Sequence, residues 1–205
     1  MDARPFLALS LAFCSVLGTA SCGGSLKHVS DITPSVAGSL SRIWVLDEQA
    51  SDDPAEAMAG ARPGPEAAGP GQAGRGAGSG GNPEAARALG RLATVVPRRL
   101  EVSLSDSAVV VTYPHEEPWL LPFGEQVKRK LGEGVDVEAK AEWKDGLLSV
   151  TRKVSGAGSL KETFHPSSNG EHLTVAVELT MGQRGGVAFR RVYQPDGASR
   201  GAPPR

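Results

Sequence analysis

The chain has 205 residues, of which 26 are glycine and 15 are proline, and its 22 basic and 23 acidic residues leave a net charge of −1. This length suits one domain with tails. The balanced charge contains neither a basic stripe typical of nucleic-acid binding nor an acidic block. Both cysteines lie within the first 22 residues, so the sequence predicts neither a disulfide nor a thiolate metal site downstream.

Residues 1–21 have the order of a secretory signal peptide: one basic residue, Arg4, then an apolar run over 6–17, then small residues before Cys22. The apolar run is shorter than the roughly 20 residues that span a bilayer. The sequence Thr-Ala-Ser-Cys resembles the lipobox of bacterial lipoproteins. This resemblance implies a lipid on Cys22 and a membrane-anchored protein of the bacterial cell envelope that faces the periplasm. The alternative is cleavage near Ala20, which would leave a secreted or soluble periplasmic protein.

Residues 22–40 are mainly polar without a clear period, and we expect a tether or a loosely docked arm. A single domain is predicted over 41–194, beginning with an apolar, β-branched strand at 42–46. Asp53 and Asn82 each precede a proline, which is the pattern of a helix N-cap followed by proline at the first helical position. The sequence therefore predicts one or two short helices after the first strand.

Two segments lack the composition of a folded core. The Gly/Pro/Ala-rich insertion at 60–82 contains no aromatic residue and no aliphatic residue larger than alanine. Burial cannot offset the entropy of ordering such a segment. Residues 195–205 are polar and rich in glycine and proline. We expect both segments to be disordered, the first as an insertion within one domain.

From the middle of the chain onward the apolar residues recur with the period of two that is typical of half-buried strands. The clearest case is 135–154, where Asp145-Gly146 favours a type I′ hairpin turn and places Trp143 opposite Leu148. Prolines around 119–123 indicate an edge or irregular strand. In total the sequence predicts a mainly β fold: an antiparallel meander of about eight or nine strands that forms a barrel or a strongly curved sheet.

Three charged residues share the phase of the apolar face: Arg152, Glu162 and Arg191. Pairing Val154 with Leu160 across a five-residue loop would place Arg152 directly opposite Glu162. Buried charges need partners, so one interpretation is an Arg–Glu–Arg network that fixes the register or fills the barrel. The other is a site for the anionic group of an amphipathic ligand, because two guanidiniums and one carboxylate leave a surplus positive charge.

The segment 114–118, Pro-His-Glu-Glu-Pro, is the other polar cluster. Histidine and glutamate bind metals, but this spacing fits no established catalytic arrangement, and an acidic loop bounded by prolines is usually solvated. The sequence also contains no nucleophile elbow, no phosphate-binding loop and no His-Glu-x-x-His motif. We therefore expect no metal site, no cofactor and no enzymatic activity.

Trp44 on a first strand, the helical interruption, the run of hairpins and the closing segment 189–193 resemble small exported bacterial lipoproteins with lipocalin-like β-barrels. The resemblance covers 41–194 without the insertion, and it implies a barrel that can bind a small apolar or amphipathic ligand. The alternative is a structural or partner-binding lipoprotein with a filled barrel and no small-molecule ligand. An internal cavity of roughly 300 Å³ or more would favour the first interpretation.

Overall fold

The computed structural model describes residues 32, 34–60, 82–114, 116–131, 134–182 and 186–197. Its elements in chain order are α1 (Pro34–Leu40), β1 (Arg42–Asp47), α2 (Pro54–Gly60), α3 (Pro83–Thr94), β2 (Arg99–Leu104), β3 (Ala108–Thr112), β4 (Trp119–Pro122), β5 (Gln126–Leu131), β6 (Val135–Lys144), β7 (Leu147–Val154), β8 (Gly158–Pro166), β9 (Leu173–Met181) and β10 (Gly186–Pro195). The predicted signal peptide at 1–21, Cys22, most of the insertion at 60–82 and the residues from 198 onward lie outside the described residues.

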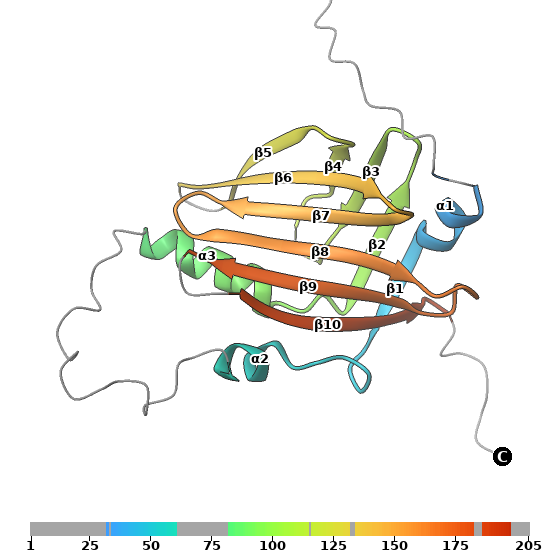
Figure 1. Ribbon diagram of the computed structural model, residues 1–205, viewed down its shortest axis with the longest axis horizontal. Coiled ribbons are helices and arrows are strands. Elements are labelled where there is room, and N and C mark those ends of the chain that lie inside the picture. Colours follow the sequence, from blue (N-terminus) through green and yellow to red (C-terminus); the bar gives the residue numbers. More distant parts are fainter. Residues whose placement is uncertain are drawn as a thin grey trace, which may run out of the picture.

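The strands form one antiparallel sheet of ten strands in the order β4-β3-β2-β1-β10-β9-β8-β7-β6-β5, and this sheet curls into a nearly closed barrel (Figure 1). The first and last strands pair, with Leu46 opposite Tyr193. Phe123, just after β4, forms a bridge with Ala141 of β6, so the sheet approaches itself where its two edges meet. The predicted barrel of antiparallel strands is confirmed, with ten strands in the described residues instead of eight or nine.

Apolar residues alternate inward along the strands, as the period of two predicts. In β2, Leu100, Val102 and Leu104 are buried and the residues between them are exposed. The largest fully buried apolar side chains fill the interior and include Trp44, Phe123, Phe164, Leu121, Leu148, Leu173 and Tyr193. Each fully buried Leu or Phe stabilises the fold by about 1.5–3 kcal/mol relative to exposure. Most of the barrel interior is therefore occupied by the protein's own side chains.

The hairpin of β6 and β7 has the predicted register, with Trp143 opposite Leu148 and Glu138 opposite Lys153. The turn residue Asp145 has φ +53° and Gly146 has φ +78°, as a type I′ turn requires.

The next pairing differs from the prediction. Val154 pairs with Gly158 rather than Leu160, so Arg152 is opposite Leu160 and not opposite Glu162. The loop has three residues instead of five because Gly158, at φ +150°, lets β8 begin earlier; a Cβ there would lie 2.0 Å from the Thr180 carbonyl oxygen and 3.0 Å from Leu89 of α3. A shift of two residues keeps every side chain on the same face of the sheet, so the inward direction of the charged residues is unchanged.

Helix α3 begins where the Asn-Pro pair predicts, and the Asn82 Oδ1 accepts a hydrogen bond from the Glu84 N–H at 2.9 Å. Its buried face, which includes Leu89 and Leu92, packs against one end of the barrel. The Asp-Pro pair starts α2 in the same way, since the Asp53 Oδ1 accepts from the Ala55 N–H at 2.7 Å. In the described residues, no helix is both long enough and apolar enough to cross a membrane.

Helix α1 was not predicted, because residues 34–40 were expected to belong to the tether. Leu40 is fully buried, and the Trp44 Nε1–H donates to the Leu40 carbonyl oxygen at 3.1 Å. The burial of this one leucine docks a short helix that has no amphipathic period. At the other terminus, Pro195 lies within β10 opposite Trp44, so the final strand extends into the segment expected to be a disordered tail.

Candidate functional site

The three charged residues predicted on the apolar face lie together inside the barrel. Arg152 of β7, Glu162 of β8 and Arg191 of β10 are 2%, 1% and 1% exposed. The Glu162 carboxylate bridges both guanidiniums: its Oε2 lies 2.9 Å from the Arg152 Nη2, and its Oε1 lies 3.0 Å from the Arg191 Nη1. Arg152 and Glu162 meet diagonally across neighbouring strands, because the register places them two residues apart.

Two further groups contact this buried cluster. Tyr113, directly after β3, donates its hydroxyl hydrogen to the Glu162 Oε2, and the Arg152 guanidinium lies 4.3 Å from the centre of the Tyr113 ring. Arg191 donates from Nη2 to the carbonyl oxygen of Ala93 at 2.9 Å. Ala93 is in the last turn of α3, where unpaired carbonyls favour a cation. The cluster therefore links the helix to the strands beneath it.

The charges of this cluster hold one another in place. Burial raises the pKa of Glu162, but the nearby guanidiniums of Arg152 and Arg191 outweigh burial and hold it below its usual range. Burial raises the pKa of the Tyr113 phenol well above its ordinary value, so this hydroxyl remains a neutral donor. Burial lowers the pKa of Arg152, and the Glu162 carboxylate more than reverses that effect. The three charged groups thus carry two positive charges and one negative charge.

The guanidiniums retain hydrogen-bonding capacity that Glu162 does not use. Within the described part of the chain, the Nε atoms of Arg152 and Arg191 are buried without a hydrogen-bond partner. The Arg152 Nη1 lies 3.8 Å from the Glu116 Oε2, which is longer than a hydrogen bond. Buried donors are nearly always paired in folded proteins, so these two unpaired N–H groups are an unusual feature of the cluster.

A cavity of about 300 Å³ lies beside the cluster, at the end of the barrel that α3 covers. Its apolar wall consists of Ala88, Leu92, Val95, Pro97, Pro114 and Leu131, and its polar residues are Arg91, Tyr113, Glu116, Arg152 and Arg191. The volume is at the lower end of the range of small-molecule sites, which are mostly apolar with a few convergent polar groups. The barrel is thus filled over most of its interior and hollow at one end.

A second hollow, of about 390 Å³, lies near the α2 side of the molecule and is lined by Leu46, Glu48, Ser51, Asp52, Asp53, Val96 and Arg98. Its charged residues are exposed and paired on the surface, for example Glu48 with Arg98 at 3.3 Å and Asp52 with Arg190 at 3.4 Å. Exposed ion pairs of this kind are weak. The cavity beside the buried cluster is the better candidate for a binding site.

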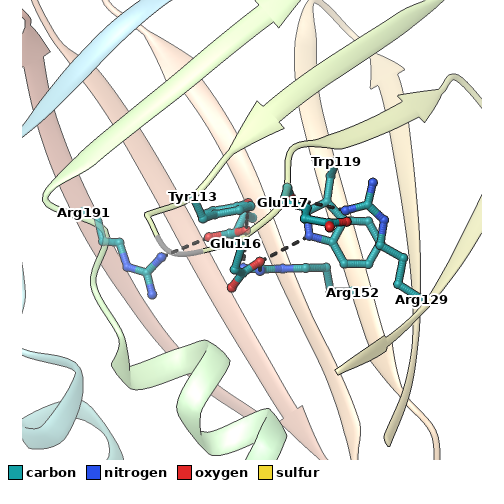
Figure 2. A network of polar contacts seen from close by, with 8 residues as sticks. Tyr113, Glu116, Glu117, Trp119, Arg129, Arg152 and Arg191 are labelled. Carbon is teal, nitrogen blue, oxygen red and sulfur yellow. Dashed lines mark hydrogen bonds and ion pairs between the residues drawn. The ribbon is translucent and has the colours of Figure 1, made fainter. Parts of the chain in front are cut away.

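Glu116 lies at the edge of the cavity, within the segment 114–118 that was expected to be solvated. It is half-buried, and its Oε2 accepts a hydrogen bond from the Trp119 Nε1–H at 3.2 Å. Arg129 of β5 lies 4.5 Å from the centre of the Trp119 ring and donates to the Glu117 and Pro118 carbonyl oxygens at 3.2 and 2.7 Å. Figure 2 shows these contacts running from Arg191 to Arg129.

In the described residues, no three histidine, cysteine, aspartate or glutamate side chains are grouped to hold an ion. His115 itself lies outside them. Neither Tyr113 nor Glu116 was predicted to belong to the cluster. Tyr113 is in phase with the buried Val109 and Val111, and that phase was sufficient to place its side chain inside.

No family model and no curated protein matches the sequence. Solved structures with a similar fold include a secretary abundant heat soluble (SAHS) protein from Ramazzottius varieornatus, at 10% identity and TM-score 0.48 over 77% of this chain and 96% of that one. Fatty-acid-binding protein 1 of Echinococcus granulosus is similar at 11% identity and TM-score 0.46, over 78% and 99%. A Schistosoma mansoni fatty acid binding protein in complex with arachidonic acid is similar at 17% identity and TM-score 0.45, over 78% and 98%. At these identities and TM-scores the likeness assigns neither a family nor a ligand to this chain, and the resemblance to exported lipoproteins stays a prediction.

Proposed function

We propose that this protein binds a small amphipathic ligand with an anionic group in the cavity beneath α3. The observation that carries this proposal is the pair of buried guanidiniums beside an apolar-walled cavity of about 300 Å³. One carboxylate, Glu162, is bonded to both of them. The buried trio carries a surplus positive charge, and the Arg91 guanidinium also lines the cavity, so the site favours an anion over a neutral or cationic group.

The walls supply the apolar half of the interaction. Leu92 and Val95 of the α3 end and Leu131 of β5 line the cavity, and burying a ligand methylene against such surfaces contributes about 0.8 kcal/mol. Guanidinium groups suit carboxylates because their N–H donors match the two oxygens. The size of the cavity favours a short-chain carboxylate over a long-chain lipid.

Three probes with the same alkyl chain test the proposal: octanoate, octanol and octyltrimethylammonium. Titration calorimetry is expected to show the tightest binding for octanoate, because only its head group pairs with the arginines. Binding that does not depend on the head group would contradict the anionic specificity. Binding of none of the three would favour the alternative of a filled structural barrel.

Val95 and Leu120 form a matched pair for locating the site. Both are large, exposed apolar residues, 63% and 56% exposed, but only Val95 lines the cavity. Val95→Trp is expected to weaken octanoate binding by obstructing the entrance, and Leu120→Trp is expected to leave it unchanged. Equal effects of the two variants would place the binding site elsewhere.

We propose further that the protein is exported and anchored to the envelope membrane through a lipid on Cys22. The order of charged, apolar and small residues over 1–22 supports this proposal, and several acyl chains would give stable attachment where one chain alone would not. Mass spectrometry of the mature amino terminus is expected to find acylated Cys22. Cys22→Ser should release the protein from membranes, whereas Cys14→Ser should not. An unmodified chain cleaved near Ala20 would contradict the anchor and support a soluble periplasmic or secreted protein.

A further inference from the structure

Arg152 is paired with two carboxylates of different character. Glu162 is 1% exposed and accepts from Arg152, Arg191 and Tyr113, so it is a permanent part of the core. The side chain of Glu116 is 28% exposed, and its oxygen lies 3.8 Å from the Arg152 Nη1. Among the described residues, its carboxylate accepts one hydrogen bond, from the Trp119 indole N–H. Glu116 can therefore leave Arg152 without unpairing the buried network.

The charges around Arg152 favour the replacement of Glu116 by an anionic group of a ligand. The charges of Arg152, Arg191, Glu162 and Glu116 sum to zero, so Glu116 compensates the surplus positive charge of the buried cluster, and Arg91 is the other cation that lines the cavity. An anionic group that reached the Arg152 Nη1 would lie close to the Glu116 carboxylate, and like charges at such separations repel each other. The two anions therefore compete for the same guanidinium.

We propose that the Glu116 carboxylate is an internal stand-in for the anionic group of the ligand. It leaves Arg152 when an anionic amphipath enters the cavity, and its charge sets how strongly the site prefers an anion. This inference rests on the proposed binding function of the cavity. It adds a residue that determines specificity without contributing an attractive contact to the bound ligand.

The surroundings of Glu116 allow its side chain to move alone. Arg129 holds the following backbone through the carbonyl oxygens of Glu117 and Pro118, and its guanidinium packs on the Trp119 ring. The backbone is therefore fixed on the side nearest β4, whereas the partly exposed carboxylate has access to water. A change of side-chain rotamer is sufficient to release Arg152.

Two neutralising substitutions test the inference, because Glu116→Gln and Glu117→Gln change the net charge of the protein equally. Glu117 is exposed and does not line the cavity. Glu116→Gln is expected to tighten octanoate binding by up to about fivefold, the upper limit for loss of a partly exposed competing ion pair, and to leave octanol binding unchanged. Glu117→Gln is expected to change neither.

The Trp119 indole supplies a second measurement, because it loses its acceptor when Glu116 moves away. In ¹H–¹⁵N spectra of the tryptophan indoles, octanoate is expected to shift the Trp119 signal, identified through Trp119→Phe, and octanol is not. The Trp44 indole, which donates to the Leu40 carbonyl oxygen, serves as the internal reference. In Glu116→Gln the shift caused by octanoate should be much smaller.

The outcomes separate this inference from the function on which it rests. If the native protein binds octanoate but both glutamine variants behave like it and the Trp119 signal stays in place, Glu116 is not a competitor and only this inference is wrong. If neither the native protein nor Glu116→Gln binds any probe, the proposed function is wrong as well. Binding of octanoate only after Glu116→Gln would support both, since it would mean that the stand-in excludes the ligand.

Discussion

The two ends of the barrel contain similar structural elements, but within the described residues only one of them has unpaired buried hydrogen-bond donors beside a cavity. Each end has a helix and an arginine that packs on an aromatic ring. At the α1 end the Arg42 guanidinium lies 5.3 Å from the centre of the Trp44 ring. At the α3 end the Arg152 guanidinium lies 4.3 Å from the centre of the Tyr113 ring. Figure 1 places α1 and α3 at opposite ends of the sheet.

At the α1 end the polar hydrogens are bound by backbone carbonyls. Arg42 donates to the Gly38 and Gly170 carbonyl oxygens, each at 3.1 Å, and Trp44 donates to Leu40. Leu40 and Trp44 are fully buried. At the α3 end the guanidinium Nε atoms lack partners among the described residues, and a cavity remains. At the α1 end, Arg42 binds backbone carbonyl oxygens and the interior is filled. At the α3 end, two arginines keep buried donors without partners, and a cavity is left beside them in which a ligand could bind.

The largest expected effect comes from removing the shared carboxylate at the α3 end. Glu162→Leu leaves two buried guanidiniums without their main partner, and it should lower the free energy of unfolding by about 3–5 kcal/mol. Urea denaturation measures this loss. The control is Arg152→Met/Glu162→Leu/Arg191→Met, in which the charges are removed together, so that stability should be largely recovered. A Glu162→Leu protein as stable as the native one would mean that the network is not a structural requirement.

A smaller loss of stability is expected at the α1 end of the barrel. Leu40→Ala removes the buried anchor of α1 and should cost about 2–5 kcal/mol, in the lower half of that range because α1 is short and adjusts. Urea denaturation gives the stability, and octanoate titration of the folded variant gives its affinity. The affinity should equal that of the native protein. A large change in affinity would show that the two ends of the barrel are coupled.

The smallest expected effect is the response of the network to acid, because burial and the arginines act on Glu162 in opposite directions. Its pKa is lower in the folded state, so the ionised carboxylate stabilises the fold fully above its unfolded value of about 4.3. That stabilisation is lost as the pH falls through the lower folded value. The difference in unfolding free energy between the native protein and Glu162→Gln should therefore shrink as the pH falls below about 4.3, the unfolded pKa of glutamate. A difference that grew with acidity would show that burial, and not the arginines, decides the pKa.

The hairpin centred on Asp145-Gly146 was predictable in full, because a two-residue turn fixes the register and both faces of its strands agree with it. The pairing of β7 with β8 was not. Sequence alone did not reveal that Gly158 already belongs to the strand, since its role depends on the closeness of Thr180 and α3. The error was two residues, so the prediction that Arg152 and Glu162 share the inner face remained correct.

The cluster was predictable only where its members lie on strands. Arg152, Glu162 and Arg191 follow the period of their strands, so their direction could be read from the sequence. Glu116 lies in a connection without a period, and no pattern could show that it approaches Arg152. Ala93 accepts through its backbone, which its identity as alanine does not reveal. What the sequence lacked was the position of α3 and of the β3–β4 connection over the end of the barrel.

The close packing of Gly158 against Leu89 of α3 suggests a way to change the size of the cavity. Any added atom there meets the Leu89 side chain as well as the neighbouring strand, so this glycine sets how deeply α3 sits on the barrel. Shortening Leu89 to alanine or valine would let the helix settle further inward, whereas bulkier residues would lift it. The spacing between one helix and one glycine could thus be used to select ligands of different chain length, within the range that keeps the hydrogen bond from Arg191 to the Ala93 carbonyl oxygen of α3.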